Sequence, residues 1–207
     1  MSGKSSEIRN YFSRLIDELN RLNLRELEDF SQVLFDAWLH RRLVFVCGNG
    51  GSAATASHLA QDLAKGTIRD ADLLSYAVPR FKAISLVANI SWLTALGNDL
   101  GYEQVFVQQL ANYAQPGDVL IAISGSGNSP NILAAVEWAN DHELMTLGMT
   151  GFDGGRLRAM QKKGIHVPLN DMEMVESIHS CICHWLVNDL RQRIYEAIVS
   201  SATRESK

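Results

Sequence analysis

Residues 118–140 read DVLIAISGSGNSPNILAAVEWAN, and this order of residue types sets the architecture. The first seven residues form an almost unbroken apolar run, which is typical of a strand whose two faces are both covered. A loop rich in glycine and serine follows at 124–129. The stretch 129–140 then indicates a helix, with Pro130 near its start, where proline is tolerated. The segment therefore predicts a strand, a tight loop and a helix in direct succession.

The same alternation of strand and helix continues on both sides of this segment. Four more short, apolar runs separated by helical stretches predict strands at 43–47, 81–87, 144–150 and 164–169. A long helix is expected from about Met174 to Val199, after the last strand. Strands and helices that alternate over short connections favour a three-layer α/β/α fold with a five-stranded parallel sheet.

The first 40 residues contain two amphipathic helices rather than strands. Apolar residues recur there at steps of three and four, the spacing of one helical face. With no strand between them, the two helices are expected to form a hairpin that covers the core, or one that pairs with another subunit. We interpret the chain as a single domain, 1–207, made of the hairpin (1–40), an α/β core (41–170) and the long helix (171–200).

Composition narrows the classes of function. Of the 207 residues, 46% are hydrophobic and 20% charged, which suits a globular domain. Lys and Arg number 19 and Asp and Glu 23, so the net charge of −4 gives no general attraction to nucleic acid or to anionic membranes. The three cysteines form no C-x-x-C pair, and the N-terminal residues lack the apolar core of a signal peptide. We expect a cytoplasmic protein that binds neither nucleic acid nor membrane.

Two loops rich in glycine and serine carry the first functional signal. They lie at 48–52 (GNGGS) and 124–129 (SGSGNS), and each connects a predicted strand to a predicted helix. Glycines there let a backbone approach an anion closely, and the helix N-terminus offers free N–H groups, so such loops can hold phosphate. The alternative is that both are ordinary tight turns. Neither ends in the G-K-[ST] of a P-loop, and no acidic residue is convincingly placed for a dinucleotide, which favours a phosphorylated small molecule.

Ionisable residues on two predicted helices carry the second signal. His58 and Asp62 are four residues apart and therefore share a helical face. Glu176 and His184 lie roughly 12 Å apart along an ideal helix, from the rise of 1.5 Å per residue. Either the last helix begins after Glu176, or these two residues serve sites shared between subunits. Between them, His179 is interpreted as a structural histidine of the core or of an interface.

Two further groups of residues are ambiguous from sequence. Cys181 and Cys183 lie in a strongly apolar stretch, which favours buried packing for both. The pair Asn98 and Asp99 follows the predicted second strand and fits either a plain turn or a loop that holds sugar hydroxyls.

Five motifs taken in order closely resemble the sedoheptulose-7-phosphate isomerases (phosphoheptose isomerases), which consist of one sugar-isomerase (SIS) domain. The motifs are GNGGS-x5-H, TALGNDLGYEQVF, GDVLIAISGSGNSPNI, TGFDGG and VESIHSCICH. The resemblance covers most of the chain. It implies a sheet of flavodoxin-like strand order, a homotetramer with active sites at subunit interfaces, and a sugar phosphate as substrate.

The resemblance also implies roles for individual residues. For catalysis, the two loops and the positions of the ionisable residues lead us to expect Asp62 as the base and His184 as acid and base toward the oxygens. Zinc, one ion per subunit, is implied with ligands at His58, Asp62, Glu176 and His184. Substrate contacts are implied at Asn49, Gly50, Gly51, Ser52, Asn98, Asp99, Ser124, Gly125, Ser126, Ser129 and Glu176.

Three positions depart from the family pattern. Asp62 stands where the family has Glu, and a side chain shorter by one methylene changes the reach of a base or a ligand. Glu176 replaces Gln, and its charge should tighten a divalent ion but repel an anionic intermediate. The second loop has Gly125 where the usual members have Thr, which removes one hydroxyl.

The expected reaction is the aldose–ketose isomerisation of sedoheptulose 7-phosphate to D-glycero-D-manno-heptose 7-phosphate through an enediol. The family's usual destination for this product is ADP-heptose and the heptose of lipopolysaccharide. The alternative is a non-catalytic SIS-domain protein that binds sugar phosphates or acts as a scaffold for a replication initiator. Retention of both His58 and His184 favours the enzyme.

Overall fold

The computed structural model describes the backbone of residues 2–205 and the side chains of residues 4–201. Its centre is a five-stranded sheet in the order β2-β1-β3-β4-β5, in which every neighbouring pair is parallel. This confirms the predicted parallel sheet and its flavodoxin-like order. The strands are β1 (Val44–Gly48), β2 (Ala83–Ser85), β3 (Val119–Ser124), β4 (Met145–Thr150) and β5 (Lys163–His166).

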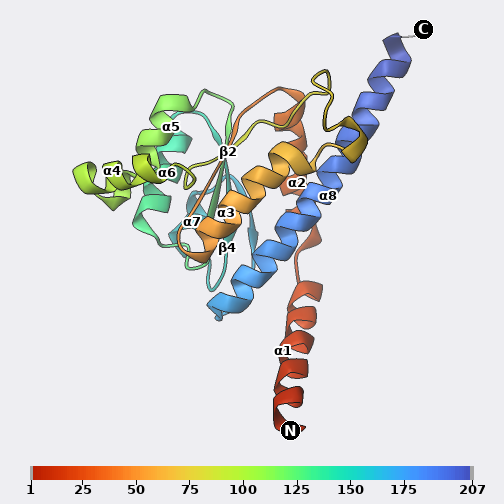
Figure 1. The fold of residues 1–207 in the computed structure, drawn as a ribbon. Helices are drawn as coiled ribbons and strands as arrows, with labels where there is room; N and C mark the ends of the chain where they lie inside the picture. Colours follow the sequence, from red (N-terminus) through yellow and green to blue (C-terminus); the bar gives the residue numbers. More distant parts are fainter. Residues whose placement is uncertain (1, 206–207) are drawn as a thin grey trace.

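Helices cover both faces of the sheet, as Figure 1 shows. Side chains of alternate strand residues point to opposite faces, and both sets are apolar here. Val46 and Ile121 join one core, whereas Phe45 and Leu120 join the other. One face carries α2 (Leu24–Leu39), α3 (Gly51–Gln61) and α8 (Met172–Glu205), and the other carries α5 (Val107–Tyr113), α6 (Pro130–Asp141) and α7 (Gly155–Met160). The three predicted layers are confirmed.

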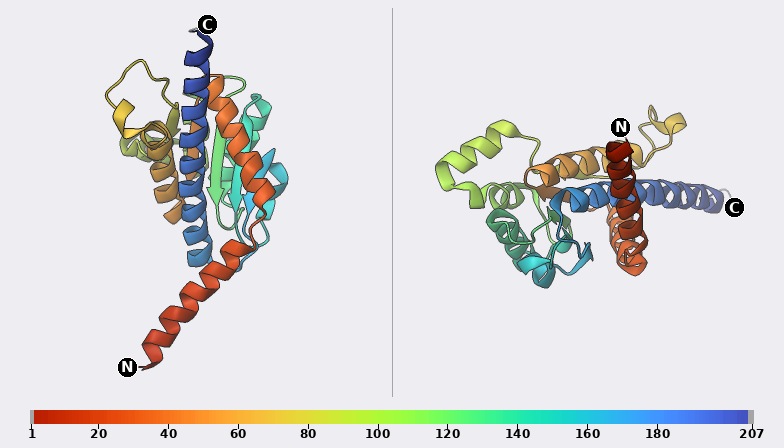
Figure 2. Two further views of the ribbon diagram at one scale, coloured as in Figure 1. Left: turned by 90° about the vertical axis from the view of Figure 1, so that its right-hand side faces the viewer. Right: turned by 90° about the horizontal axis from the view of Figure 1, so that it is seen from below.

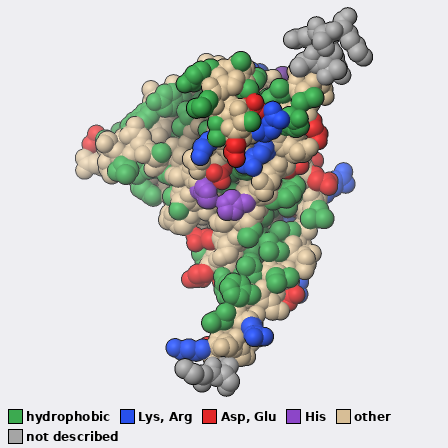
Figure 3. All heavy atoms as spheres, turned by 45° about the vertical axis from the view of Figure 1, so that its right-hand side comes forward, with side chains coloured by type: hydrophobic (Ala, Val, Ile, Leu, Met, Phe, Trp, Pro, Cys, Tyr) green, Lys and Arg blue, Asp and Glu red, His purple; other side chains and the backbone are tan. Residues whose placement is uncertain are grey.

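Both predicted N-terminal helices are present, but their arrangement differs from a hairpin that lies on the core. Figures 1 and 2 show α1 (Ser2–Asn20) directed away from the body of the domain. Only its C-terminal end, including Leu15 and Leu19, packs against the core. Ile8, Phe12 and Ile16 are more than half exposed, and Figure 3 shows hydrophobic side chains gathered along this projecting arm. Ile8, Phe12 and Ile16, which belong to the apolar stripe that predicted burial, therefore have little cover within the described chain.

Shorter elements complete the chain. A wide π-helical turn, η1 (Asp62–Gly66), continues directly from α3. The predicted loop over 66–80 contains one 3-10 turn, η2 (Asp70–Asp72), and α4 (Ile90–Leu100) and η3 (Tyr102–Gln104) connect β2 to α5. None of the described helices combines the length and the apolarity needed to span a bilayer.

A core substitution in α2 tests the packing of this layer. Leu34 is fully buried, whereas Leu39, on the same helix, is about half exposed. We expect Leu34→Ala to lower the free energy of unfolding by about 2–5 kcal/mol, because it removes buried methyl groups and leaves a cavity. Urea denaturation measures this, with Leu39→Ala as the control that changes it by less than about 0.5 kcal/mol. Equal effects of the two substitutions would contradict the packing described.

Candidate functional site

The two glycine-serine loops lie next to each other because their strands are neighbours. β1 pairs with β3 in parallel, so both strands end at the same edge of the sheet. The helix after β1, α3, covers one face, and the helix after β3, α6, covers the other. The chain therefore departs in opposite directions from two adjacent strands, which opens a crevice at the point where α/β sheets bind ligands.

A cavity of about 250 Å³ fills this crevice. Its walls come from both loops and from the first turns of α8. The residues that line it are Asn49, Gly50, Gly51, Ser52, Ile123, Ser124, Gly125, Ser126, Ser129, Met172 and Glu176. Nine of the eleven substrate-binding residues predicted from the sequence thus share one cavity, and Asn98 and Asp99 are not among its walls.

Serine hydroxyls converge in the second loop. The Ser124 hydroxyl oxygen lies 3.5 Å from that of Ser129 and accepts a hydrogen bond from the Gly127 amide at 3.2 Å. Gly127 has φ +65°, and a Cβ there would collide with the carbonyl oxygen of Gly154. The glycine is therefore required for the loop to fold back on itself and to present its hydroxyls to one point.

Two residues that the sequence did not single out fix the first loop. The amides of Asn49 and Asn131 donate to each other, at 2.8 and 2.9 Å, and Asn131 is buried. The Tyr102 hydroxyl also donates to Asn49, at 2.9 Å. Asn131 belongs to the start of α6, so this amide pair ties the two loops together. The only sequence signal was that Tyr102 and Asn131 lie within the motifs TALGNDLGYEQVF and GDVLIAISGSGNSPNI quoted above.

One acidic side chain enters the cavity from α8. A Cβ added at Gly51 would fall on the carboxylate of Glu176, so this carboxylate lies over the first residue of α3. A negative charge is favoured at a helix N-terminus by the helix dipole and the free N–H groups. Of the described residues that line the cavity, only Glu176 carries a charge. The donors that this chain offers to an anion there are hydroxyls and backbone amides.

A second group forms where α3 and α8 lie side by side. His58 Nε2 is 3.3 Å from Asp62 Oδ2, and the rings of His58 and His184 stand edge to face with centroids 5.1 Å apart. The three ligand atoms lie within 4.8 Å of one another, and Figure 3 shows histidine side chains together on this face. Two imidazoles and a carboxylate this close are a donor set that suits zinc.

Glu176 is not part of this group. Because α8 is continuous from Met172, the idea that the helix begins after Glu176 is wrong, and Glu176 and His184 remain roughly 12 Å apart along one axis. His58 follows Gly51 by seven residues on α3, a similar separation. The two helices therefore run in the same direction, with the cavity at one end of their contact and the histidines at the other.

Asn98 and Asp99 form neither a turn nor a loop beside the cavity. They belong to the last turn of α4, where the Asn98 amide donates to the Asp99 carboxylate at 2.8 Å. Figure 1 shows α4 on the side of the domain away from α8. None of the described residues of α4 is buried, so the helix has little cover within this chain.

The residues between Glu176 and His184 divide into buried and exposed sets. His179 is buried, with Nε2 3.3 Å from the Thr150 carbonyl oxygen, which confirms the interpretation as a core histidine. Burial lowers its pKa to about 4, despite the opposing effect of that carbonyl. Cys183 is also buried, and burial, followed by the nearby Asp62 charge, raises its pKa to about 12. Cys181 is exposed, so the expectation that both cysteines are buried is wrong, because residues two apart face opposite sides of a helix.

Comparison with known proteins defines the class first. A family model described as the SIS domain matches residues 7–151. The parallel fold with its loop-lined crevice is thus that of a sugar-isomerase domain.

Similar proteins then narrow the assignment. The phosphoheptose isomerase of Maridesulfovibrio salexigens is 35% identical over 187 residues, which cover 86% of this chain and 87% of that protein. Solved structures of phosphoheptose isomerases from Neisseria gonorrhoeae and Francisella tularensis superpose with TM-scores of 0.80, at 27% and 29% identity. Each comparison covers 91% of this chain and 98% of the solved one. The chain belongs to the phosphoheptose isomerase family.

The buried histidine gives a pH-dependent stability that can be measured. The pKa of His179 is about 4 in the folded protein and 6.5 ordinarily, so the unfolded chain binds more protons between these values. Acidification from pH 7 to pH 5 should lower the free energy of unfolding by about 2 kcal/mol through this residue. Urea denaturation at both pH values should show a smaller loss for His179→Gln. The exposed control His142→Gln should keep the wild-type loss, and an unchanged loss in His179→Gln would contradict the assignment.

Proposed function

We propose that this protein is an aldose–ketose isomerase that converts sedoheptulose 7-phosphate to D-glycero-D-manno-heptose 7-phosphate. The observation that carries the proposal is the convergence of two hydroxyl- and amide-bearing loops on one cavity, in a chain of the phosphoheptose isomerase family. The relatives named above are phosphoheptose isomerases, which does not favour the alternative of a non-catalytic scaffold.

The two glycine-serine loops are proposed to bind the phosphate group of the substrate. Hydroxyls of Ser124, Ser126 and Ser129 and amides of the first loop supply donors to a dianion, and Glu176 accepts hydrogen bonds from sugar hydroxyls. Binding energy gained at the phosphate then holds the far end of the sugar in place for the reaction. Asn98 and Asp99 are proposed to bind sugar hydroxyls. They do not line the cavity of their own chain, so this requires an assembly in which α4 of one copy lies beside the cavity of another.

Proton transfer is assigned to the group at the other end of the α3–α8 contact. Asp62 takes the proton from C1 of the ketose while the oxygen at C2 gains one, which gives an enediol. The carboxylic acid returns its proton to C2, and the oxygen at C1 loses one, so the aldose forms with no net gain or loss of atoms. His184 donates and accepts the protons of the oxygens, because an imidazole ring carries both a donor and an acceptor nitrogen.

The same group is proposed to hold one zinc ion per subunit. His58, Asp62 and His184 offer two nitrogens and a carboxylate, a usual donor set for zinc. Glu176 joins them as a fourth ligand only if a second copy of the chain supplies it, since it lies roughly 12 Å from His184 along α8. When bound, the ion would polarise the carbonyl oxygen of the sugar.

We further propose a cytoplasmic homotetramer that serves heptose synthesis for ADP-heptose and lipopolysaccharide. The support for assembly is the exposure of Ile8, Phe12 and Ile16 on α1 and the lack of fully buried residues in α4. Free cysteines and the absence of a C-x-x-C pair support a reducing compartment.

Substitution of the proposed base tests the chemistry. Asp62→Asn keeps the size of the side chain but cannot accept the proton, so we expect the turnover of sedoheptulose 7-phosphate to fall by about 10²–10⁴-fold. Conversion is followed by chromatography of the two heptose phosphates, and circular dichroism checks folding. Asp70→Asn, in the exposed turn η2, is the control with normal turnover. Near-normal turnover of Asp62→Asn would remove Asp62 from this role.

The proposed tetramer depends on the exposed face of α1. Replacing Ile8, Phe12 and Ile16 with serine removes that apolar stripe, and light scattering should then report a mass below that of four chains. The control replaces Arg9 and Asn10, also exposed on α1, with serine and keeps the wild-type mass. A wild-type mass of one chain, or a tetramer that survives the triple substitution, would contradict the proposal.

A further inference from the structure

Asp62 lies where the backbone changes from the α-helix α3 to a wider π-helical turn. Asp62 is the first residue of the π-helical turn η1, in which the helix is wider than in α3. Its amide is shared between the carbonyls of His58 and Leu59, the last bonds of the regular helix. Asp62 is therefore held by the regular helix on its N-terminal side and by the packing of the wide turn on its C-terminal side.

The far end of this turn is held by α8. Gly66 ends η1, and carbonyls at the end of a helix have no helical partner. The Arg191 guanidinium donates a hydrogen bond from Nε to the Gly66 carbonyl. Val187 closes the gap on the same side, since a Cβ at Gly66 would lie 3.2 Å from Val187 Cγ1 and 3.7 Å from the Cβ of Asp62. Gly66 is thus enclosed between α8 and the side chain of Asp62.

Arg191 and His184 are on one face of α8. They are seven residues apart, about two helical turns. One face of α8 therefore supplies two side chains. His184 completes the group with His58 and Asp62, and Arg191 forms the hydrogen bond to the end of the turn that begins at Asp62.

We propose that Arg191 is a positioning residue: by holding the Gly66 carbonyl, it keeps the Asp62 carboxylate within reach of His58 and His184 for binding a divalent cation. This inference rests on the metal site of the proposed function. Groups that orient a ligand from outside the site commonly change metal affinity by about 10–100-fold when removed.

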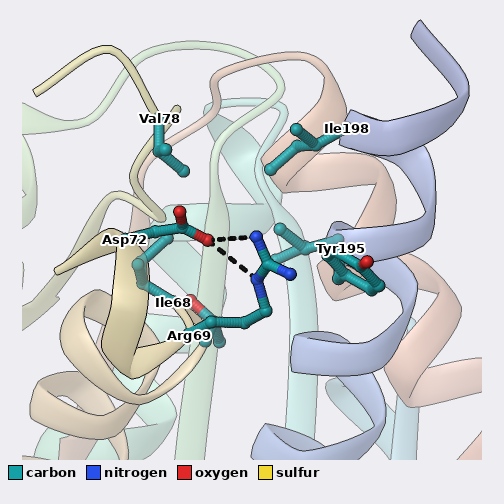
Figure 4. Close-up of a pocket in the computed structure, with 8 residues that line it drawn as sticks. Ile68, Arg69, Asp72, Val78, Tyr195 and Ile198 are labelled. Atoms are coloured by element: carbon teal, nitrogen blue, oxygen red, sulfur yellow. Dashed lines mark hydrogen bonds and ion pairs between the residues drawn. The ribbon is translucent and has the colours of Figure 1, made fainter. Parts of the chain in front are cut away.

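A neighbouring arginine provides the matched control. Figure 4 shows Arg69 with its guanidinium directed to Asp72 and placed against the ring of Tyr195. The Arg69–Asp72 ion pair measures 2.6 Å, and the guanidinium carbon lies 4.0 Å from the ring centroid. Tyr195 is one turn beyond Arg191 on α8, and Arg69 lies beyond Gly66 in the chain. Arg69→Ala therefore removes an arginine contact between the same two segments without touching η1.

Binding of Co²⁺ and Zn²⁺ to the full-length, metal-stripped protein tests the proposal. Calorimetry gives the affinities, and the visible absorption of bound Co²⁺ reports the geometry of its ligands. Arg191→Ala should weaken binding by about 10–100-fold and alter the Co²⁺ spectrum, with an unchanged melting temperature of the metal-free chain. Arg191→Lys, which still offers a donor, should restore most of the affinity, and Arg69→Ala should bind as the wild type does.

The outcomes separate this inference from the proposed function. An Arg191→Ala variant with wild-type affinity and spectrum, a wild-type chain that binds neither ion, or an equal loss in Arg69→Ala would overturn the role of Arg191. Turnover of sedoheptulose 7-phosphate by the wild-type protein is measured on the same preparation. If turnover is absent while Arg191→Ala still weakens Co²⁺ binding, the isomerase proposal fails and the positioning role stands.

Discussion

Parallel pairing of β1 with β3 is the constraint on which the site depends. It places the ends of two buried strands at one edge, and the helices that follow them leave to opposite faces. Backbone amides and hydroxyls of both loops are then concentrated in one crevice without any long-range ionic contact. The reciprocal hydrogen bonds between the amides of Asn49 and Asn131 also connect the two loops. The width of the crevice therefore depends both on the pairing of the strands and on this hydrogen-bonded pair.

The long helix α8 is the second organising element. It contacts α3 and then η1. Glu176 lies at the cavity, His184 lies beside His58, and Arg191 binds the end of η1. A continuous helix is rigid over this distance, so the cavity and the histidine–aspartate group keep a fixed separation. That suits a substrate whose phosphate and reacting carbons lie at opposite ends of one chain. It also keeps Glu176 and His184 roughly 12 Å apart along one helix axis.

Parts of the surfaces of α1 and α4 are poorly covered within the described chain. α1 exposes a stripe of large apolar side chains, and α4 carries polar candidates, Asn98 and Asp99, away from the cavity. Both features have the same physical basis. Apolar side chains that stay in water contribute less to stability than buried ones, and part of the apolar surface of each helix is not buried within the described chain. Assembly of several copies would resolve both at once, consistent with the tetramer proposed above.

The amino-acid sequence was enough to predict the five strands, the three layers and the two loops, because hydrophobic periodicity and glycine-serine turns are local properties. It also placed His58 and Asp62 on one face, since four residues complete about one helical turn. It did not reveal Tyr102, Asn131 or Arg191, whose partners are distant in the chain, and it mistook Asn98 and Asp99 for a turn or loop. Only the tertiary structure separated Glu176 from the histidines, buried Cys183 but not Cys181, and left much of the apolar face of α1 exposed. Each of these depends on which surface meets which other surface, and that is set by the packing of whole elements rather than by neighbouring residues.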